Sequence, residues 1–211
     1  LVCAIVDAGS RHDGAVPGLA HFTEHMLFQG TKSLPDEQIK FVAAEHGIAI
    51  NAATSKEFLF VETSSILPGK IDIALDLCKE AIINPTFPKD SFEREKKVVL
   101  SEIGDSEDSA LRKALESAKA KICKHPFKIP VLGTTESITK ASVNDMYNFH
   151  QTLFTPSRTT VCYAGSLSLK EFTQVCEEKF GNWEVKPTTW DTKVSHDFQA
   201  NNIIKRPDIN Q

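Results

Sequence analysis

Residues 18–30 read Gly-Leu-Ala-His-Phe-Thr-Glu-His-Met-Leu-Phe-Gln-Gly, an apolar run interrupted by three titratable side chains. A glycine at each end punctuates a helix that we predict over residues 19–29. Residues three and four apart share one face of a helix, so His21, Glu24 and His25 project together. Apolar residues occupy nearly every other side, which predicts a buried helix whose polar patch lies in a largely dry setting.

Buried His and Glu side chains need partners, because an unpaired charge in the interior is costly. The spacing H-x-x-E-H offers a metal ion as that partner, since His21 and His25 can each present a ring nitrogen to one Zn²⁺. Glu24 then remains free to act on a water bound to the metal. The alternative is that both histidines are ordinary core side chains bonded to the backbone or to Glu24. The presence of all three residues on one buried face favours the metal.

A catalytic zinc ion usually takes three protein ligands and leaves one position for water, so a further ligand is needed. A helix predicted from Asp90, where Asp90 and Glu93 have the spacing of a capping box, offers two candidates. Glu95 and Glu102 are seven residues apart, within about 20° on a helical wheel, and they interrupt an apolar face. A purely structural role is the alternative for both. The opposite, solvated side is predicted to carry Glu93, Arg94, Lys97 and Ser101.

Strand-like and helical patterns alternate along the chain. The runs 48–53 and 58–66 are separated by Thr54-Ser55-Lys56-Glu57, which predicts a hairpin. This order of elements predicts an α+β fold, with a mixed, mainly antiparallel sheet and helices packed on it. Further strands are predicted over 1–6 and 159–163, and further helices over 35–46, 71–82, 90–123 with a kink at Gly104, 142–151 and 169–180.

The composition is that of a soluble globular protein, with 41% hydrophobic residues and no apolar run near the ~18 residues of a membrane span. The net charge is −4 and the basic residues are scattered, so we expect neither nucleic acid nor a membrane as a partner. The five cysteines are widely spaced and contain no C-x-x-C. They are interpreted as reduced thiols, which favours a reducing compartment such as a bacterial cytoplasm or a mitochondrion-type organelle.

With these features the sequence resembles the N-terminal half of the pitrilysin-type (M16) zinc peptidases, which include insulin-degrading enzymes and mitochondrial processing peptidases. The likeness covers almost the whole chain and is nearest in pattern to the processing-peptidase-like (M16B) members. It is carried by residues 7–11 (Asp-Ala-Gly-Ser-Arg), 18–31, 51–55 (Asn-Ala-Ala-Thr-Ser), 92–95 (Phe-Glu-Arg-Glu), 98–102 (Val-Val-Leu-Ser-Glu), 125–126 (His-Pro) and 132–134 (Leu-Gly-Thr).

The resemblance implies a zinc-dependent endopeptidase that cleaves peptides, targeting segments or pro-segments. The zinc ligands that it implies are His21, His25 and Glu102. It makes Glu24 the general base that activates the water, and Glu95 a supporting carboxylate behind the ligands.

Substrate is expected to bind in extended form along an edge strand that contains Asn51, Ala52 and Ala53, as in β-augmentation. For Asn51, a merely polar role at the end of a hairpin strand is an equal alternative. Members of the family consist of two related halves that close around the substrate. The resemblance therefore divides the chain into a metal-binding peptidase domain (1–185) and a connector (186–211) toward an absent second homologous domain.

That second half or subunit is the expected partner, and we expect poor activity without it. The chain opens on Leu1 inside an apolar run, without an initiator Met, and is expected to be a fragment.

In mitochondrial processing peptidases, acidic residues ten and fourteen positions beyond the glutamate ligand are associated with arginine recognition. Here these positions hold Arg112 and Glu116, which weakens a presequence-processing role. The alternative function is a non-catalytic subunit or assembly scaffold of the same family, and a non-peptidase zinc hydrolase is a third candidate.

Overall fold

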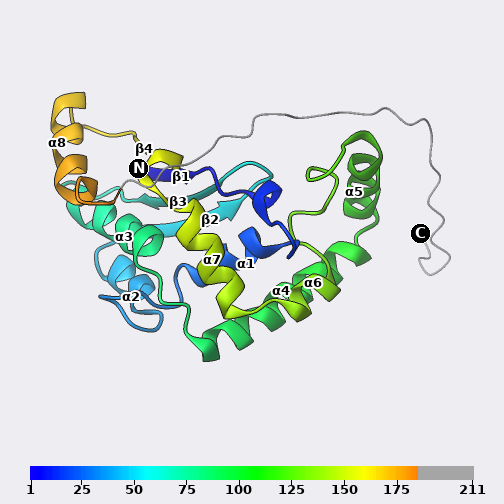
Figure 1. Cartoon of the computed structure of the whole chain (residues 1–211). Helices are drawn as coiled ribbons and strands as arrows, with labels where there is room; N and C mark the ends of the chain where they lie inside the picture. The colour runs from blue at the N-terminus through cyan, green and yellow to red at the C-terminus, as the bar shows by residue number, and fades with distance from the viewer. Residues whose placement is uncertain (185–211) are drawn as a thin grey trace.

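The computed structural model describes residues 1–184 and places a four-stranded sheet on a layer of helices (Figure 1). The strand order is β2-β3-β1-β4, and all three pairings are antiparallel. The predicted α+β fold is therefore confirmed, with a sheet whose described strands pair only in the antiparallel sense. The strands are β1 (Val2–Val6), β2 (Ala49–Thr54), β3 (Leu59–Ser64) and β4 (Thr159–Tyr163).

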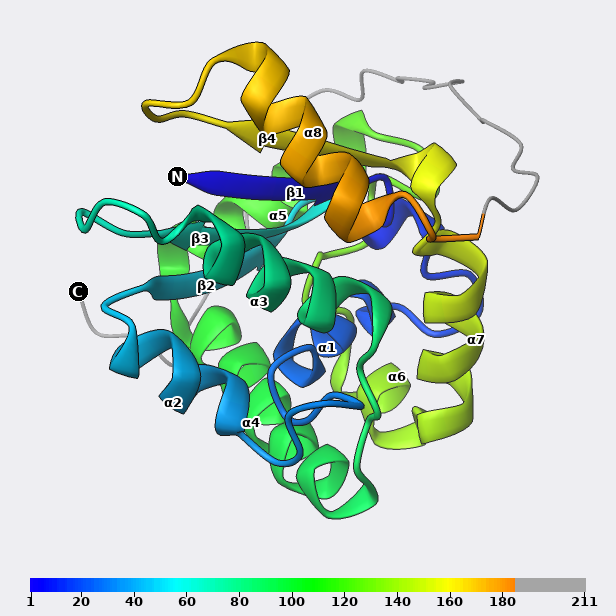
Figure 2. The same ribbon diagram turned by 90° about the vertical axis from the view of Figure 1, so that its left-hand side faces the viewer.

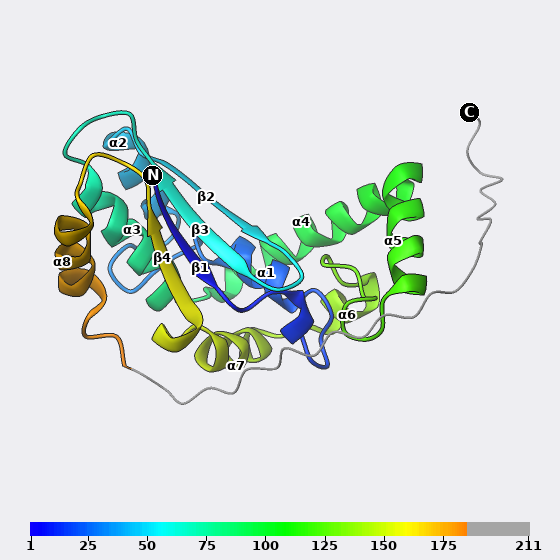
Figure 3. The ribbon, with the colours of Figure 1, turned by 90° about the horizontal axis from the view of Figure 1, so that it is seen from above.

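The helices pack mainly on one face of the sheet (Figure 2), and Figure 3 looks onto the opposite face, where the strands lie in front of the helices. The long helix α4 runs along the base of the molecule, below α1. The helices are α1 (Leu19–Met26), α2 (Gln38–Glu45), α3 (Ile71–Ile83), α4 (Lys89–Asp108), α5 (Ala110–Ile122), α6 (Thr135–Lys140), α7 (Val143–Leu153) and α8 (Leu169–Phe180), with the 3₁₀ turns η1 (Ser10–His12) and η2 (Pro156–Arg158).

The sheet faces the helices with every second residue, as the period of a half-buried strand requires. In β1, Val2, Ala4 and Val6 are buried, whereas the residues between them are only half-buried. In β3, Leu59 and Val61 follow the same alternation. This alternation fixes the register, because a slip of one residue would turn the apolar set toward solvent.

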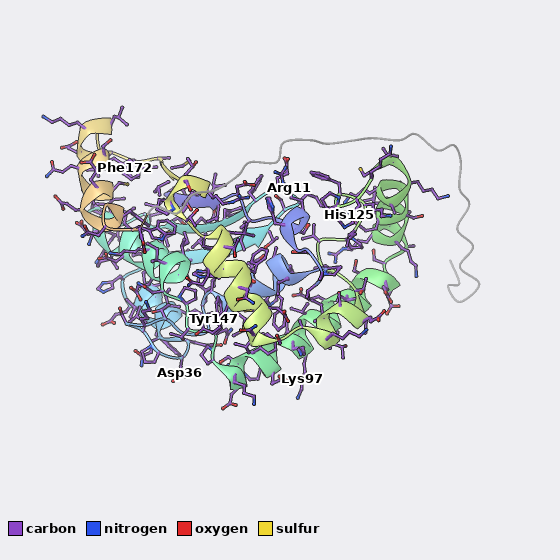
Figure 4. The ribbon with its side chains drawn as sticks, viewed as in Figure 1. Arg11, Asp36, Lys97, His125, Tyr147 and Phe172 are labelled. Atoms are coloured by element: carbon purple, nitrogen blue, oxygen red, sulfur yellow. The ribbon has the colours of Figure 1, made fainter. Side chains whose placement is uncertain are left out.

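Helix α1 lies at the centre of the core, as its apolar sequence predicts. Ala20, Phe22 and Met26 have no exposed surface. Phe22 stacks on Phe92 of α4, with ring centroids 4.6 Å apart. Burying such side chains stabilises the fold by about 1.5–3 kcal/mol each, so the spacing of α1 and α4 is firmly set. Lys97 lies on the outer, solvated side of α4 (Figure 4), as predicted.

Two predictions about the long helix are wrong. The predicted kink at Gly104 is absent, because α4 continues to Asp108 and the break lies at Ser109. Ser109 has an extended backbone (φ −75°, ψ 111°), and its side chain accepts a hydrogen bond from the Arg112 N–H, so it caps a new helix. The predicted capping box at Asp90 is also absent, since α4 begins at Lys89 after Pro88 without a side-chain cap.

The remaining differences are smaller. Helix α1 ends at Met26 rather than residue 29, and α2 begins at Gln38 rather than residue 35. Helix α6 is too short for an apolar period to predict it, and Thr134 and Ser137 start it with a capping box.

Helix α5 projects from the body of the molecule beyond the end of α4 (Figures 1 and 3), and none of its residues is buried. Among residues 1–184, no helix is both long and apolar enough to span a membrane. The predicted connector, 186–211, lies outside the described residues.

Candidate metal centre and active site

The two histidines of α1 and one carboxylate of α4 meet at a single point. Glu102 Oε2 lies 3.5 Å from His21 Nε2 and 3.5 Å from His25 Nε2. One ligand atom from each of the three residues falls within 4.8 Å of the others. Ligand atoms about 2.0–2.2 Å from a tetrahedral zinc ion lie about 3.3–3.6 Å apart, so the two contacts to Glu102 have the spacing of a shared ion.

The protonation state of His21 also suits a metal ligand. Its side chain is only 12% exposed, and burial, followed by the nearby His25, lowers the pKa of His21 to about 4. The ring is therefore neutral near pH 7, with a nitrogen lone pair to donate. A neutral His21 forms no ion pair with Glu102, so their 3.5 Å approach suits either a hydrogen bond from the ring or a shared metal ion.

A second carboxylate holds His25 from behind. Glu95 Oε2 lies 3.1 Å from His25 Nδ1, while its other oxygen accepts a hydrogen bond from Gln29 Nε2 at 3.0 Å. An imidazole that donates from Nδ1 presents the Nε2 lone pair to a metal, which is how outer carboxylates orient ligands. Glu95 therefore lies at Nδ1 of His25, while Glu102 lies at Nε2 of the same ring, and its supporting role stays a prediction.

Gln29 and Arg94 extend this arrangement and are not predicted from the sequence. Gln29 is 2% exposed, and its Oε1 accepts a hydrogen bond from the Arg94 guanidinium at 3.2 Å. The sequence does contain a signal for Gln29, because it is a lone amide at the end of an apolar run. A buried amide needs hydrogen-bond partners. Arg94 lies on the solvated side of α4, as predicted, yet its guanidinium reaches back to Gln29.

Glu24 lies beside the histidines and points to β2. Its Oε2 accepts a hydrogen bond of 2.6 Å from the Thr54 hydroxyl. Burial raises the pKa of Glu24, and the Thr54 hydrogen bond opposes that shift. The carboxylate is consequently more basic than an exposed glutamate and is held in one orientation, both of which suit a general base. From the sequence, Thr54 is expected in the hairpin turn and in the segment 51–55 that carries the resemblance, but no contact with Glu24 is predicted.

The predicted substrate strand is β2, at the end of the described strand order. Ala53 and Thr54 line a pocket of about 480 Å³ together with His21 and Glu24. Asn51 is exposed and lies opposite Glu62 in β3, and neither it nor Ala52 lines this pocket. The structure therefore brings Ala53 to the candidate site and places the other two farther along the same strand.

Comparison with known proteins identifies the family. The sequence model of "Insulinase (Peptidase family M16)" matches residues 2–135, and that of "Peptidase M16 inactive domain" matches residues 140–211. The chain belongs to peptidase family M16. The resemblance inferred from the sequence is thereby confirmed.

Relatives of this M16 chain include an uncharacterized zinc protease of Mycobacterium leprae, 33% identical over 84% of the chain and 40% of the relative. An uncharacterized zinc protease of Bacillus subtilis is 30% identical over 86% of the chain and 44% of the relative. A probable mitochondrial-processing peptidase subunit beta of Arabidopsis thaliana is 27% identical over 91% and 36%. The chain thus spans less than half the length of these relatives.

Solved structures show the same M16 fold. A protease from Helicobacter pylori superposes with a TM-score of 0.81 and 21% identity, over 93% of this chain and 48% of that one. A peptidase M16 inactive domain from Pseudomonas fluorescens gives a TM-score of 0.82 and 22% identity, over 91% and 47%.

The start of helix α1 is fixed by the carboxylate of Asp13, a residue that no sequence pattern points to. Asp13 accepts hydrogen bonds from the N–H groups of Gly18 at 2.6 Å and Ala20 at 2.8 Å. Burial raises the pKa of Asp13 to about 7, and these two bonds oppose the shift. Gly18 has φ +88°, and a Cβ there would lie 2.4 Å from the Leu132 carbonyl oxygen. Only glycine fits this corner, which anchors the helix that carries His21 and His25.

Proposed function

We propose that this chain is the metal-binding half of a zinc-dependent endopeptidase. His21, His25 and Glu102 would hold one Zn²⁺, and Glu24 would be the general base. The observation that supports this most directly is the convergence of three ligand atoms within 4.8 Å, on buried helices, beside a carboxylate of raised pKa. The relatives named zinc proteases support zinc as the metal.

The chain's own residues account for the proton transfers of peptide hydrolysis. A bound zinc ion supplies a water of lowered pKa and polarises the scissile carbonyl. Glu24 accepts the proton of the attacking water and returns it to the leaving amine, while Thr54 keeps its carboxylate oriented. Glu95 accepts the Nδ1 proton of His25 in a hydrogen bond. The proton therefore stays on Nδ1, and Nε2 keeps the lone pair that binds the metal.

Substrate is proposed to bind as an extended strand along β2, where Asn51, Ala52 and Ala53 would offer backbone groups for pairing. Glu24 and Ala53 line one pocket, so a peptide paired to this strand passes the proposed base. A second homologous half or subunit would complete the site. The division into a peptidase domain (1–185) and a connector (186–211) belongs to this proposal.

The second candidate is a non-catalytic subunit or scaffold of the family. The close grouping of two histidines and two carboxylates argues against it, because a scaffold has no need of a buried basic carboxylate next to paired histidines. These residues are His21, Glu24, His25 and Glu102.

The test is Glu24→Gln in the natural protein at its full length, with zinc content measured by mass spectrometry and cleavage measured on quenched fluorescent peptides. We expect stoichiometric zinc and a loss of activity of about 10²- to 10⁴-fold. Glu93→Gln, an exposed position on α4, is the matched control and should change neither value. Full activity in Glu24→Gln would remove the proposed base. A purified wild-type protein with no bound zinc would favour the scaffold.

A further inference from the structure

Two cysteines face each other on the side of the sheet opposite the helices. Cys3 of β1 and Cys162 of β4 are direct partners in the antiparallel register, on strands that lie side by side (Figure 3). Val2 and Ala4 are buried against the helices, so Cys3 between them points to the opposite face. Residues directly opposite in a strand pair project on the same face of the sheet. The Cys162 side chain therefore lies on the face of the sheet to which Cys3 points.

The hydrogen bonds between β1 and β4 set the separation of the two cysteines. Leu1 N donates to the Ala164 carbonyl at 2.9 Å, and Ala164 N donates back to the Leu1 carbonyl at 3.0 Å. Hydrogen-bonded and non-hydrogen-bonded pairs alternate along an antiparallel ladder, so Cys3 and Cys162, two residues farther on, form a hydrogen-bonded pair. The Cα atoms of such a pair are about 5.5 Å apart, and disulfides span about 4.4–6.8 Å. The backbone thus holds the cysteines within bonding range.

A disulfide at this place would be strained and therefore easy to reduce. Opposite Cβ atoms in a sheet are about 4.5–5.5 Å apart, with the longer values in hydrogen-bonded pairs, whereas a disulfide needs about 3.5–4.5 Å. Bond formation therefore draws the two strands together. Strand β4 is free to follow, because it is last in the described strand order and pairs only with β1 among the described strands. Strained or exposed disulfides are the labile, regulatory ones.

A metal ion does not compete for these thiols. Glu62 of β3 lies opposite Cys3 on its other side and would be the nearest candidate for a third ligand. Within the described range 1–184, however, only the candidate metal centre on α1 and α4 brings three potential ligand atoms close enough to share an ion. The chemistry that this pair of cysteines supports is therefore the formation of a sulfur–sulfur bond.

The two thiols differ in their access to an oxidant. Cys162 is exposed, whereas Cys3 is half-buried. Burial, followed by the neighbouring Cys162 and Glu62, raises the pKa of the Cys3 thiol. The thiolate is the attacking form, so Cys3 is the poorer first nucleophile. Cys162 consequently reacts first with an oxidant from solution, and Cys3 completes the bond.

We propose that Cys3 and Cys162 form a reversible disulfide that links β1 to β4, by exchange with a small-molecule disulfide such as glutathione disulfide. The Cys162 thiolate attacks one sulfur of glutathione disulfide, which gives a mixed disulfide and releases one glutathione thiolate. The Cys3 thiolate then attacks the Cys162 sulfur and releases the second glutathione thiolate. The two protons of the protein thiols pass to these thiolates, so the protein loses two electrons and glutathione disulfide gains them. This bond would form whether or not the chain is a peptidase.

Peptide mapping tests the proposal on the natural protein at its full length. The protein is treated with glutathione disulfide, its free thiols are blocked with an alkylating reagent, and it is digested with trypsin. Cys3 and Cys162 fall in different tryptic peptides, which end at Arg11 and Lys170. We expect these two peptides to be joined, with a mass equal to their sum less two hydrogens. Excess reduced glutathione, added before the blocking step, should separate them again.

Single serine variants test the order of the two steps. In Cys3→Ser the second thiol is missing, so Cys162 should retain one bound glutathione. In Cys162→Ser, the half-buried Cys3 should acquire glutathione at least about tenfold more slowly than Cys162 does in Cys3→Ser. The matched control is Cys176→Ser. Cys176 is also a half-buried thiol, but it lies on α8 and has no cysteine opposite it, so the link should form as in the wild type.

A wild-type protein in which Cys162 takes up glutathione but never joins Cys3 would overturn the proposal. So would a bond between the Cys162 residues of two copies, a link that excess reduced glutathione leaves intact, or loss of the link in Cys176→Ser. All of these measurements are made without zinc or peptide cleavage. Their failure would therefore leave the proposed peptidase function standing, and an inactive peptidase would leave the disulfide standing.

Discussion

Replacement of Glu95 by Gln tests whether the carboxylate behind His25 tunes the metal site. Glu95 uses both oxygens, one toward His25 Nδ1 at 3.1 Å and one toward Gln29 Nε2 at 3.0 Å. A glutamine has one oxygen and one NH₂ group, so one of these two contacts becomes donor against donor. Gln29 cannot simply turn over, because its own oxygen already accepts from Arg94.

The size of the effect follows from burial. The side chains of Glu95 and His25 are 15% and 16% exposed, so solvent screens their hydrogen bond only weakly. A hydrogen bond to a charged group contributes about 1.5–3 kcal/mol. Each 1.4 kcal/mol corresponds to a factor of ten in affinity. We therefore expect the zinc affinity of Glu95→Gln to fall about 10- to 100-fold, as for other outer carboxylates.

The assay is competition for zinc with a chromophoric chelator at pH 7.5, with the unfolding temperature of the metal-free protein measured in parallel. Glu93→Gln removes one negative charge from the exposed side of α4. It therefore controls for the effect of the lost charge alone on zinc affinity. An affinity within twofold of wild type for Glu95→Gln, or an equal loss in Glu93→Gln, would refute the orienting role. A loss of zinc affinity with unchanged metal-free stability supports it.

Three further outcomes are expected. Gln29→Leu should weaken zinc binding about tenfold in the same competition assay, because Glu95 loses its second partner. Thr54→Val removes a bond that lowers the pKa of Glu24, so the acidic limb of the kcat/KM profile should move to higher pH while zinc content stays constant. The pKa of Asp13 is raised from 3.8 to about 7, so the folded protein holds this proton more tightly than the unfolded chain. Its contribution to stability is therefore fully present below about pH 4 and is lost as the pH rises toward 7. Urea unfolding between pH 4 and 7 should show a shallower decline in Asp13→Asn, by up to about 1.4 kcal/mol per pH unit; parallel curves would count against the shift.

The sequence carries much of the metal centre because helical spacing is a local property. His21, Glu24 and His25 share a face wherever a helix forms, and the apolar residues around them predict that this face is buried. Glu95 and Glu102 are two turns apart on α4, so one packing contact, Phe22 on Phe92, brings both to the histidines. Two local patterns and one contact are therefore enough to predict which residues meet.

The parts that escape prediction depend on contacts between distant segments. Asp13 reaches the start of α1 only because the loop folds back, and Thr54 meets Glu24 across 30 residues of chain. No period or spacing signals such pairs. The amide of Gln29 is different. A lone polar side chain in an apolar run predicts that a hydrogen-bond partner exists, but it does not predict which residue that partner is.

The break at Ser109 decides more than the length of a helix. A serine that can accept a hydrogen bond from its own third neighbour competes with the continuing helix, whereas Gly104 lowers helix stability without offering an alternative partner. Because α4 continues past Gly104, Glu102 lies well within a regular helix and keeps its two-turn relation to Glu95. Because the chain turns at Ser109, α5 becomes the wall opposite Glu24 instead of extending α4 into solvent. The same helix pair thus fixes the candidate ligand on one side of the break and a wall of the pocket beside Glu24 on the other.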